Sequence, residues 1–150
     1  MITYRIMTID DYDAVYDLWM HTPGMGLNAV DDSREGIEAY LRRNPTSSFV
    51  AECEAGIVGV IMAGHDGRRG YIYHTAVLPI HRKQGIATTL VDHALAALEK
   101  EGIKKVALLV FKENELGNQF WEATGFSERS DIAYRNKFIQ MMEKIEIKAE

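Results

Sequence analysis

The feature that most constrains the fold is a strand–turn–helix–strand unit in the middle of the chain. Residues 70–78 form a strand-like run. After a basic turn, apolar residues recur at the spacing of one helix face, at Ala87, Leu90, Val91, Ala94, Leu95 and Leu98. Gly102 stands where the residue just beyond a helix C-terminus belongs. The nearly continuous apolar run at residues 106–111 is typical of a strand buried on both faces. Because a strand, a helix and a second strand in this order form a parallel crossover, the unit predicts a sheet covered by a helix.

Weaker signals on either side of this unit complete the expected element order. Before it they predict strands at residues 3–7, 48–52 and 57–64 and helices at about 9–20 and 33–43; after it, a short helix at about 115–124 and closing strands at 126–128 and 137–145. Thr8 and Asp11 form a capping-box pattern at the start of the first helix. Hairpins combined with one crossover predict a mixed α/β sheet (α+β) flanked by helices, in a single domain over residues 1–150.

Composition excludes several classes of protein. A formal net charge of −5 argues against a nucleic-acid binder and favours a cationic partner over an anionic one. Cys53 is the only cysteine, so no disulfide can form within the chain, and no apolar run approaches the ~20 residues of a membrane span. The first residues lack the apolar core of a signal peptide, so we expect a cytoplasmic protein that binds no membrane.

The turn between the central strand and helix has the features of an anion site. It reads Arg82-Lys83-Gln84-Gly85-Ile86-Ala87, and it aims backbone N–H groups and the positive end of a helix at one point. It lacks the Gly-Lys-Ser/Thr of a Walker loop and the G-x-G-x-x-G of a dinucleotide loop, which favours phosphates that are held but not transferred. The alternative interpretation is an ordinary turn with solvated charges.

Two motifs resemble those of the GNAT acyltransferase superfamily. The turn fits the pattern Q/R-x-x-G-x-G/A. A second group resembles N-x-x-A-x-x-[F/L]-Y-x-x-x-G-F and comprises Asn114, Gly117, Phe120, Trp121, Gly125 and Phe126. The resemblance is strongest over residues 70–126, and the expected element order is also that of the GNAT fold. It implies acetyl-CoA as the acyl donor.

The resemblance also assigns cofactor contacts. It implies that the pyrophosphate lies beside Arg82 on the amides of Lys83, Gln84, Gly85, Ile86, Ala87 and Thr88, with glycine at 85 because a Cβ would block the approach. The backbone at Ala76 and Val77 would pair with the pantetheine arm in a gap between the strands at residues 71–78 and 106–111. Asn114 would contact the cofactor or help to open this gap; a plain helix cap is the alternative, and both roles can coexist.

The chain departs from the family pattern at Trp121, where the family often has a tyrosine that protonates the leaving thiolate. An indole N–H is far too weak an acid for that role. Either another group supplies the proton, with Tyr134 as one candidate, or the thiolate leaves without enzymic help. We expect Trp121 to pack beside the cofactor arm.

No strong general base is evident. By strand alternation Tyr73 and Tyr71 share a face with Val77, so they are the leading catalytic candidates near the reacting carbonyl, and His74 should face the other way. A tyrosine with a pKa near 10 can hold a water but is a poor base, and packing is the alternative role for both. His21 borders the acceptor site of the family but is more simply an incidental loop histidine. The five histidines show no ligand spacing, so we predict no metal.

These observations predict an N-acetyltransferase that carries acetyl from acetyl-CoA to a primary amine by direct attack in a ternary complex. A backbone N–H near Val77 would polarise the thioester oxygen. The acceptor is a small-molecule amine, or a protein N-terminus or lysine, and a longer acyl group is a further possibility. The alternative function is a non-catalytic acyl-CoA-binding sensor or interaction module. Exposed sheet edges also allow a homodimer.

Overall fold

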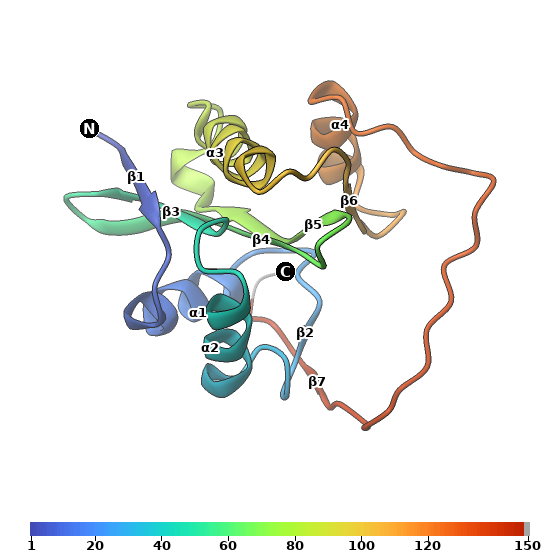
Figure 1. The fold of residues 1–150 in the computed structure, drawn as a ribbon. Helices are drawn as coiled ribbons and strands as arrows, with labels where there is room; N and C mark the ends of the chain where they lie inside the picture. The colour runs from blue at the N-terminus through green and yellow to red at the C-terminus, as the bar shows by residue number, and fades with distance from the viewer. Residues whose placement is uncertain (149–150) are drawn as a thin grey trace.

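A five-stranded sheet separates two layers of helices (Figure 1). The structure is a computed structural model and describes residues 1–148. Across the sheet the strands are ordered β1 (Thr3–Ile6), β3 (Phe49–Cys53), β4 (Gly56–His65), β5 (Gly70–Val77) and β6 (Val106–Leu108). The first four are antiparallel neighbours, and β5 and β6 are parallel. The predicted mixed sheet is therefore confirmed.

The helices cover both faces of this sheet. On one face lie α1 (Tyr12–Met20), preceded by a 3₁₀ turn at Ile9–Asp11, and α2 (Arg34–Arg43). On the other lie α3 (Ile86–Lys100), which follows a 3₁₀ turn at Pro79–His81, and α4 (Glu115–Ala123). No helix of the described residues is long and apolar enough to cross a membrane.

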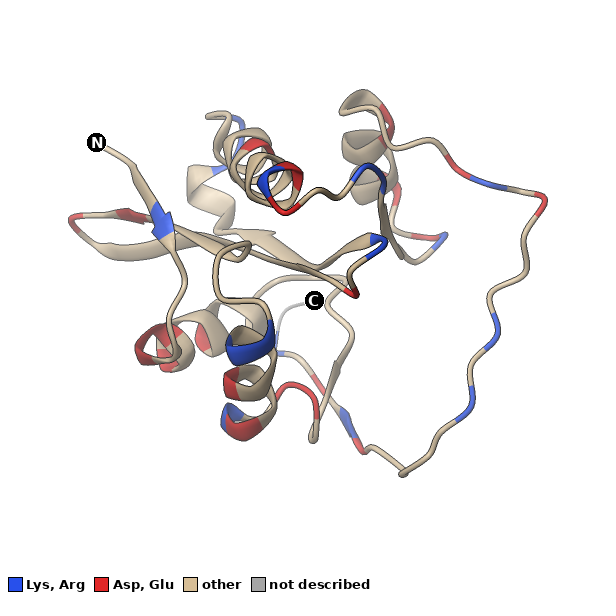
Figure 2. Ribbon diagram, viewed as in Figure 1, with Lys and Arg blue, Asp and Glu red and all other residues tan. Residues whose placement is uncertain are grey.

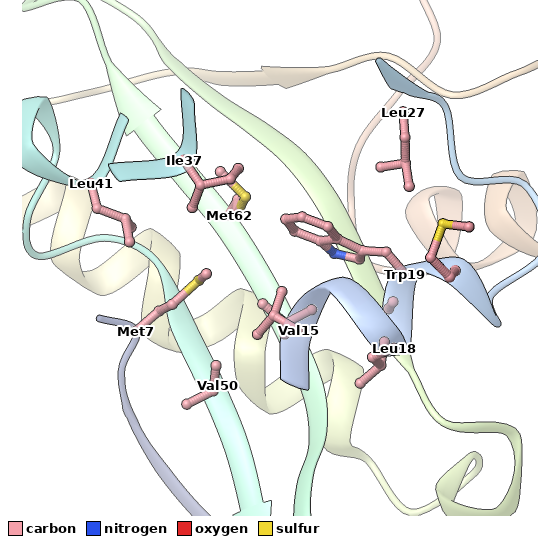
Figure 3. Packing of buried hydrophobic residues seen from close by; sticks show 12 residues of the cluster. Met7, Val15, Leu18, Trp19, Leu27, Ile37, Leu41, Val50 and Met62 are labelled. Carbon is pink, nitrogen blue, oxygen red and sulfur yellow. The ribbon is translucent and has the colours of Figure 1, made fainter. Parts of the chain in front are cut away.

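Each face of the sheet has its own core. On the α1–α2 side Trp19 is fully buried, and its ring points toward Met62 and Ile37 (Figure 3). On the α3 side Leu90, Val91, Ala94 and Leu98 are buried, which confirms the predicted helix face. The predicted helix end is also confirmed, because Gly102 has a φ of 86° and Ile103 donates its N–H to the Leu98 carbonyl at 3.1 Å.

The two helical layers differ in charge. Aspartates are concentrated on α1, on the 3₁₀ turn before it and on the segment that leads into α2, whereas α2 itself carries both glutamates and arginines (Figure 2). Asp11 also stabilises the start of this layer. Its carboxylate accepts the backbone N–H of Thr8 at 2.9 Å, as the capping-box pattern predicted, and pairs with Arg5 at 2.8 Å.

The C-terminal part of the chain departs from the prediction. The strand expected at residues 126–128 is absent, and of residues 137–145 only β7 (Lys144–Ile145) is a strand. It pairs with β2 (Leu27–Asn28), which was not predicted. The intervening segment follows an arc outside the sheet (Figure 1).

The strand predicted at residues 106–111 is also shorter and more exposed than expected. Only β6 is extended, and Leu109 and Phe111 remain 67% and 56% exposed. An apolar run predicts burial on both faces only if a further strand or helix covers it. Here β6 is the edge strand of the sheet in the described residues, so no further strand pairs with it there.

Candidate functional site

The sheet opens between β5 and β6. Their parallel pairing covers only Gly70–Val106, Tyr71–Ala107 and Ile72–Leu108. Beyond Ile72, β5 continues for five residues, 73–77, with no partner in β6. Backbone groups along this half of β5 are therefore available to an extended ligand on one side. The gap lies where the sequence predicted one.

The basic turn follows the open half of β5 after the 3₁₀ turn at Pro79–His81. Lys83 and Gly85 both have left-handed backbone conformations, with φ of 63° and 77°. Glycine adopts this conformation without strain, which gives a reason for Gly85 beyond ligand access. A Cβ added at Gly85 would meet no atom within 4 Å, so the space beside it is open. Arg82 donates from Nε to the Val77 carbonyl at 3.3 Å and ties the turn to the end of β5.

The amides of this turn have no internal partners. Among residues 1–148, none of the six backbone N–H groups of residues 83–88 donates a hydrogen bond, whereas the next amide, of Thr89, bonds to the Gly85 carbonyl at 3.0 Å. They lie at the positive end of the 15-residue helix α3. The Ile86 side chain is buried in the α3 core, so Ile86 offers only its backbone. The arrangement is a preformed cradle for an anion.

A β-bulge changes which face the β5 side chains occupy. One residue of β4, Met62, lies opposite two of β5, Tyr73 and His74. Tyr73 therefore packs against Tyr40 of α2, and His74 against Trp19 of α1, while Val77 lies in the core beneath α3. His74 does face away from Val77, as predicted, but Tyr73 lies on the same side as His74. The prediction that Tyr71 and Tyr73 share a face with Val77 is wrong. It assumed strict alternation, which a bulge shifts by one residue.

The bulge opens onto a cleft of about 400 Å³ on the α1–α2 side. β4 and β5 form its floor, and α2 and the segment before α2 form its walls. Its lining residues are Gly26, Asn28, Asp31, Asp32, Gly36, Ile37, Tyr40, Met62, Tyr73 and His74. The lining combines two carboxylates with two tyrosines and contains no lysine or arginine. This surface suits a cation with an apolar body.

His74 and Asp32 form a close, largely buried polar pair in the lining of the cleft. His74 Nε2 lies 2.6 Å from Asp32 Oδ1, and the two side chains are only 17% and 6% exposed. Asp32 Oδ2 accepts the backbone N–H of Asn28 at 2.9 Å. The ring of His74 meets the edge of Trp19 at 4.8 Å between centroids. Sequence reasoning missed this pair, because no local signal marks the bulge and 42 positions separate the two residues.

The tyrosines of the cleft are poor proton acceptors. Partial burial raises the pKa of Tyr73, with smaller effects from Tyr71, Tyr134 and Asp31. Burial likewise raises the pKa of Tyr40 well above its usual range. Both hydroxyls therefore stay protonated at neutral pH. The Tyr40 hydroxyl is buried without a hydrogen-bond partner in the described part of the chain.

Asn114 and Trp121 both have structural roles. The Asn114 side chain accepts the Gly117 N–H at 2.9 Å and so caps the N-terminus of α4. Trp121 packs edge-to-face on Phe126 and Phe120, with ring centroids 5.2 and 4.9 Å apart. The three aromatic side chains pack against the α3-side core. The predicted cofactor contacts of Asn114 and Trp121 stay predictions.

Other candidates lie outside the cleft lining. His21 is exposed and contacts the Asp17 carbonyl through Nδ1 at 2.8 Å. Tyr134 is 66% exposed on the C-terminal arc, although it is near enough to Tyr73 to affect its pKa. Residues 1–148 contain no group of three or more histidine, cysteine or acidic side chains placed to hold a metal ion.

Comparison with known proteins adds independent findings. The model of the Acetyltransferase (GNAT) family matches residues 12–126. An acetyltransferase of Pectobacterium atrosepticum is 36% identical over 111 residues, covering 74% of this chain and 77% of the relative. An uncharacterized N-acetyltransferase of Yersinia pestis is 30% identical over 135 residues, covering 90% and 94%.

Solved structures share the fold. Ard1 of Thermoplasma volcanium superposes with a TM-score of 0.76 at 22% identity, covering 86% of this chain and 84% of that one. The PaiA N-acetyltransferase of Thermoplasma acidophilum, in complex with coenzyme A, gives a TM-score of 0.75 at 17% identity, covering 88% and 93%. At these identities the likeness concerns the fold.

Proposed function

Because this chain belongs to the acetyltransferase (GNAT) family, we propose that it transfers acetyl from acetyl-CoA to a primary amine in a ternary complex. The observation that carries the proposal is the run of six amides without internal partners in the described chain, at residues 83–88, one short 3₁₀ turn after the open half of β5. One extended ligand with a pyrophosphate at one end fits both features. Acetyl-CoA is such a ligand, and coenzyme A occupies the PaiA relative.

The pantetheine arm would lie along the open edge of β5. Leu78 donates its backbone N–H to the Val58 carbonyl of β4 at 2.9 Å. Since successive residues of a strand point their N–H groups to opposite sides, the Val77 N–H faces away from β4 and toward the gap. This supports the role expected for it, which is to donate a hydrogen bond to the thioester oxygen as negative charge develops.

The acceptor amine would occupy the cleft on the α1–α2 side. Asp31 and Asp32 attract an ammonium group, and the rings of Tyr40 and Tyr73 offer apolar and cation–π contact to its carbon body. The bulge lies immediately after Ile72, the last β5 residue paired with β6, so the cleft and the gap meet at one point of the strand. Holding both reactants there supplies much of the rate by orientation alone.

Calorimetric titration with acetyl-CoA, CoA and ATP tests the cofactor half of the proposal. We expect micromolar binding of both CoA species and none of ATP, because the turn lacks the groups that hold a transferable phosphate and Mg²⁺. Absence of CoA binding by folded protein would overturn the proposal.

Free-thiol release from acetyl-CoA then tests the acceptor half. The probes are tyramine, putrescine, Nα-acetyl-lysine amide and a tripeptide with a free N-terminus. Turnover of the cationic small amines would support the cleft as the acceptor site. Binding of acetyl-CoA without turnover of any amine would instead favour the non-catalytic acyl-CoA-binding function.

A further inference from the structure

We infer that His74, oriented by Asp32, is the group that accepts the proton released when the acceptor ammonium becomes a nucleophilic amine. The inference rests on the proposed function, since it names the proton acceptor of that reaction. Three independent features of the described residues carry it: the hydrogen bonding of the ring, the charges around it, and its position in the strand.

The hydrogen bond to Asp32 leaves one nitrogen of the ring free. At 2.6 Å from a carboxylate oxygen, Nε2 must carry the hydrogen and donate it, because an ionised carboxylate only accepts. The neutral ring then has its lone pair on Nδ1. Within residues 1–148, Nδ1 makes no hydrogen bond. Nδ1 is also not fully buried, so another group can reach it. The structure therefore holds a proton-accepting nitrogen ready in the cleft lining.

The charged groups nearest to the ring are carboxylates. Asp32 faces it directly, and Asp31 lies on the same segment before α2. Tyr73 of β5 and Tyr40 of α2 are the other titratable residues of the lining. From α1, the Tyr12 hydroxyl donates to the Asp32 backbone carbonyl at 2.7 Å.

No positive side chain lines this cleft. β4 contributes the neutral Met62, and Lys144 of β7 is exposed and outside the lining. The lining therefore surrounds the imidazole with carboxylates and neutral groups.

The position of His74 matches the chemistry. It is the second residue beyond the last β5–β6 pair, and it lies at the bulge. Because of the bulge, Tyr73 and His74 both line the α1–α2 cleft, although they are consecutive residues of one strand. The fold thus places an imidazole where the open strand edge and the amine cleft meet.

The proton balance is as follows. The acceptor enters as an ammonium and gives one proton to His74 Nδ1, and the freed lone pair forms the C–N bond at the thioester carbonyl. As the C–S bond breaks, its electron pair leaves with the CoA sulfur, which takes the second proton from the acylated nitrogen, directly or through water. His74 then returns its proton to solvent. The products are the amide, free CoA thiol and one proton, so no further reactant is required.

A second histidine–carboxylate pair provides a matched control. His65 Nε2 lies 3.3 Å from Glu101 Oε1, with these side chains 22% and 50% exposed, and it lies outside the cleft lining. His65→Gln therefore makes the same chemical change as His74→Gln without touching the cleft. Any effect specific to His74 must come from its position.

Long-range ¹H–¹⁵N correlation of the imidazoles at pH 8 tests the geometry without any amine. We expect His74 to be the Nε2–H tautomer in the wild type and to lose that preference in Asp32→Asn. An Nδ1–H tautomer in the wild type would overturn the inference, because Nδ1 would then have no lone pair for a proton.

The rate of acetyl transfer tests the chemistry, measured with the fastest probe of the amine panel. We expect His74→Gln to lower kcat by about 10²-fold, a typical contribution of a general base, and to remove a rise in log kcat with pH. His65→Gln should leave both unchanged. An unaltered pH profile in folded His74→Gln that still binds acetyl-CoA would overturn the inference and leave the proposed function intact. If the folded wild-type protein did not bind acetyl-CoA, the proposed function itself would be overturned.

Discussion

The two halves of the proposed site are built from different parts of the protein. The cradle at residues 83–88 uses backbone N–H groups of one continuous segment, and its geometry depends on the local conformations of Lys83 and Gly85. The cleft uses side chains from α2, the segment before α2, β4 and β5, which only the packed fold brings together around His74. Both halves meet on β5, one at its end and one at its bulge.

This difference has a consequence for mutation. A site made of backbone groups tolerates most side-chain changes and fails only when bulk or charge fills it. A site made of side chains fails when one donor or acceptor is lost, because its neighbours remain buried and unpaired. The following predictions separate the two kinds of site, from the largest expected effect to the smallest.

Gly85→Glu should abolish measurable binding of CoA while the protein stays folded. The side chain would enter open space beside the amides and fill it with bulk and negative charge. Calorimetry with CoA, together with thermal unfolding, measures both effects.

Gly67→Glu is the matched control for Gly85→Glu. It lies in the β4–β5 turn, also has a positive φ and also points into open space. It should share the backbone strain, about 1–2 kcal/mol, but keep the CoA affinity. Retained binding in Gly85→Glu would mean that the cradle is an ordinary turn.

Asp32→Asn should lower kcat by about 10²-fold with little change in acetyl-CoA affinity, because an amide can present its N–H to Nε2 and so favours the wrong tautomer of His74. Initial rates of acetyl transfer measure kcat, and calorimetry on the same preparation measures the acetyl-CoA affinity.

Asp31→Asn is the control for Asp32→Asn, since Asp31 is exposed and does not contact His74. It should raise KM for a cationic amine by a few-fold and leave kcat near the wild-type value. Equal losses in both variants would show that the carboxylates act only through their charge.

Asn114→Ala should destabilise the fold by about 1 kcal/mol, the usual cost of losing a helix N-cap. Asn114→Ser should restore most of that stability, because serine is also a good cap. Thermal unfolding measures this, with the exposed Gln119→Ala on the same helix as a neutral control. If Asn114→Ser recovers stability but not CoA affinity, Asn114 contacts the cofactor as well as capping α4.

Tyr73→Phe should change kcat/KM by less than about threefold and leave its pH dependence unaltered. Burial raises the pKa of Tyr73, so its hydroxyl is protonated from pH 6 to 9 and has no proton transition to lose in that range. Rate profiles over that range are the measurement. A flattened profile in this variant would transfer the role of base from His74 to Tyr73.

Local sequence patterns determined the parts of the molecule that depend on neighbours along the chain. The helical spacing of Leu90, Val91, Ala94 and Leu98 predicted the buried face of α3. An apolar stripe on a helix is buried in the folded protein, whichever element packs against it. Gly85 and the basic residues before it predicted a cradle, because the amides at the start of a helix lack partners within the helix itself. Most strands of the antiparallel part were also predicted to within a residue or two.

The tertiary structure alone decided what depends on contacts between distant segments. An apolar run such as residues 106–111 cannot show whether another strand will cover it, and β6 turned out to be an edge. A bulge leaves no mark in the alternation of β5, yet it moves Tyr73 to the same face as His74, and only the fold brings His74 to Asp32. Backbone sites are therefore readable from local sequence, whereas the side-chain cleft exists only after the sheet, α1 and α2 have packed, because packing sets which residues share a space.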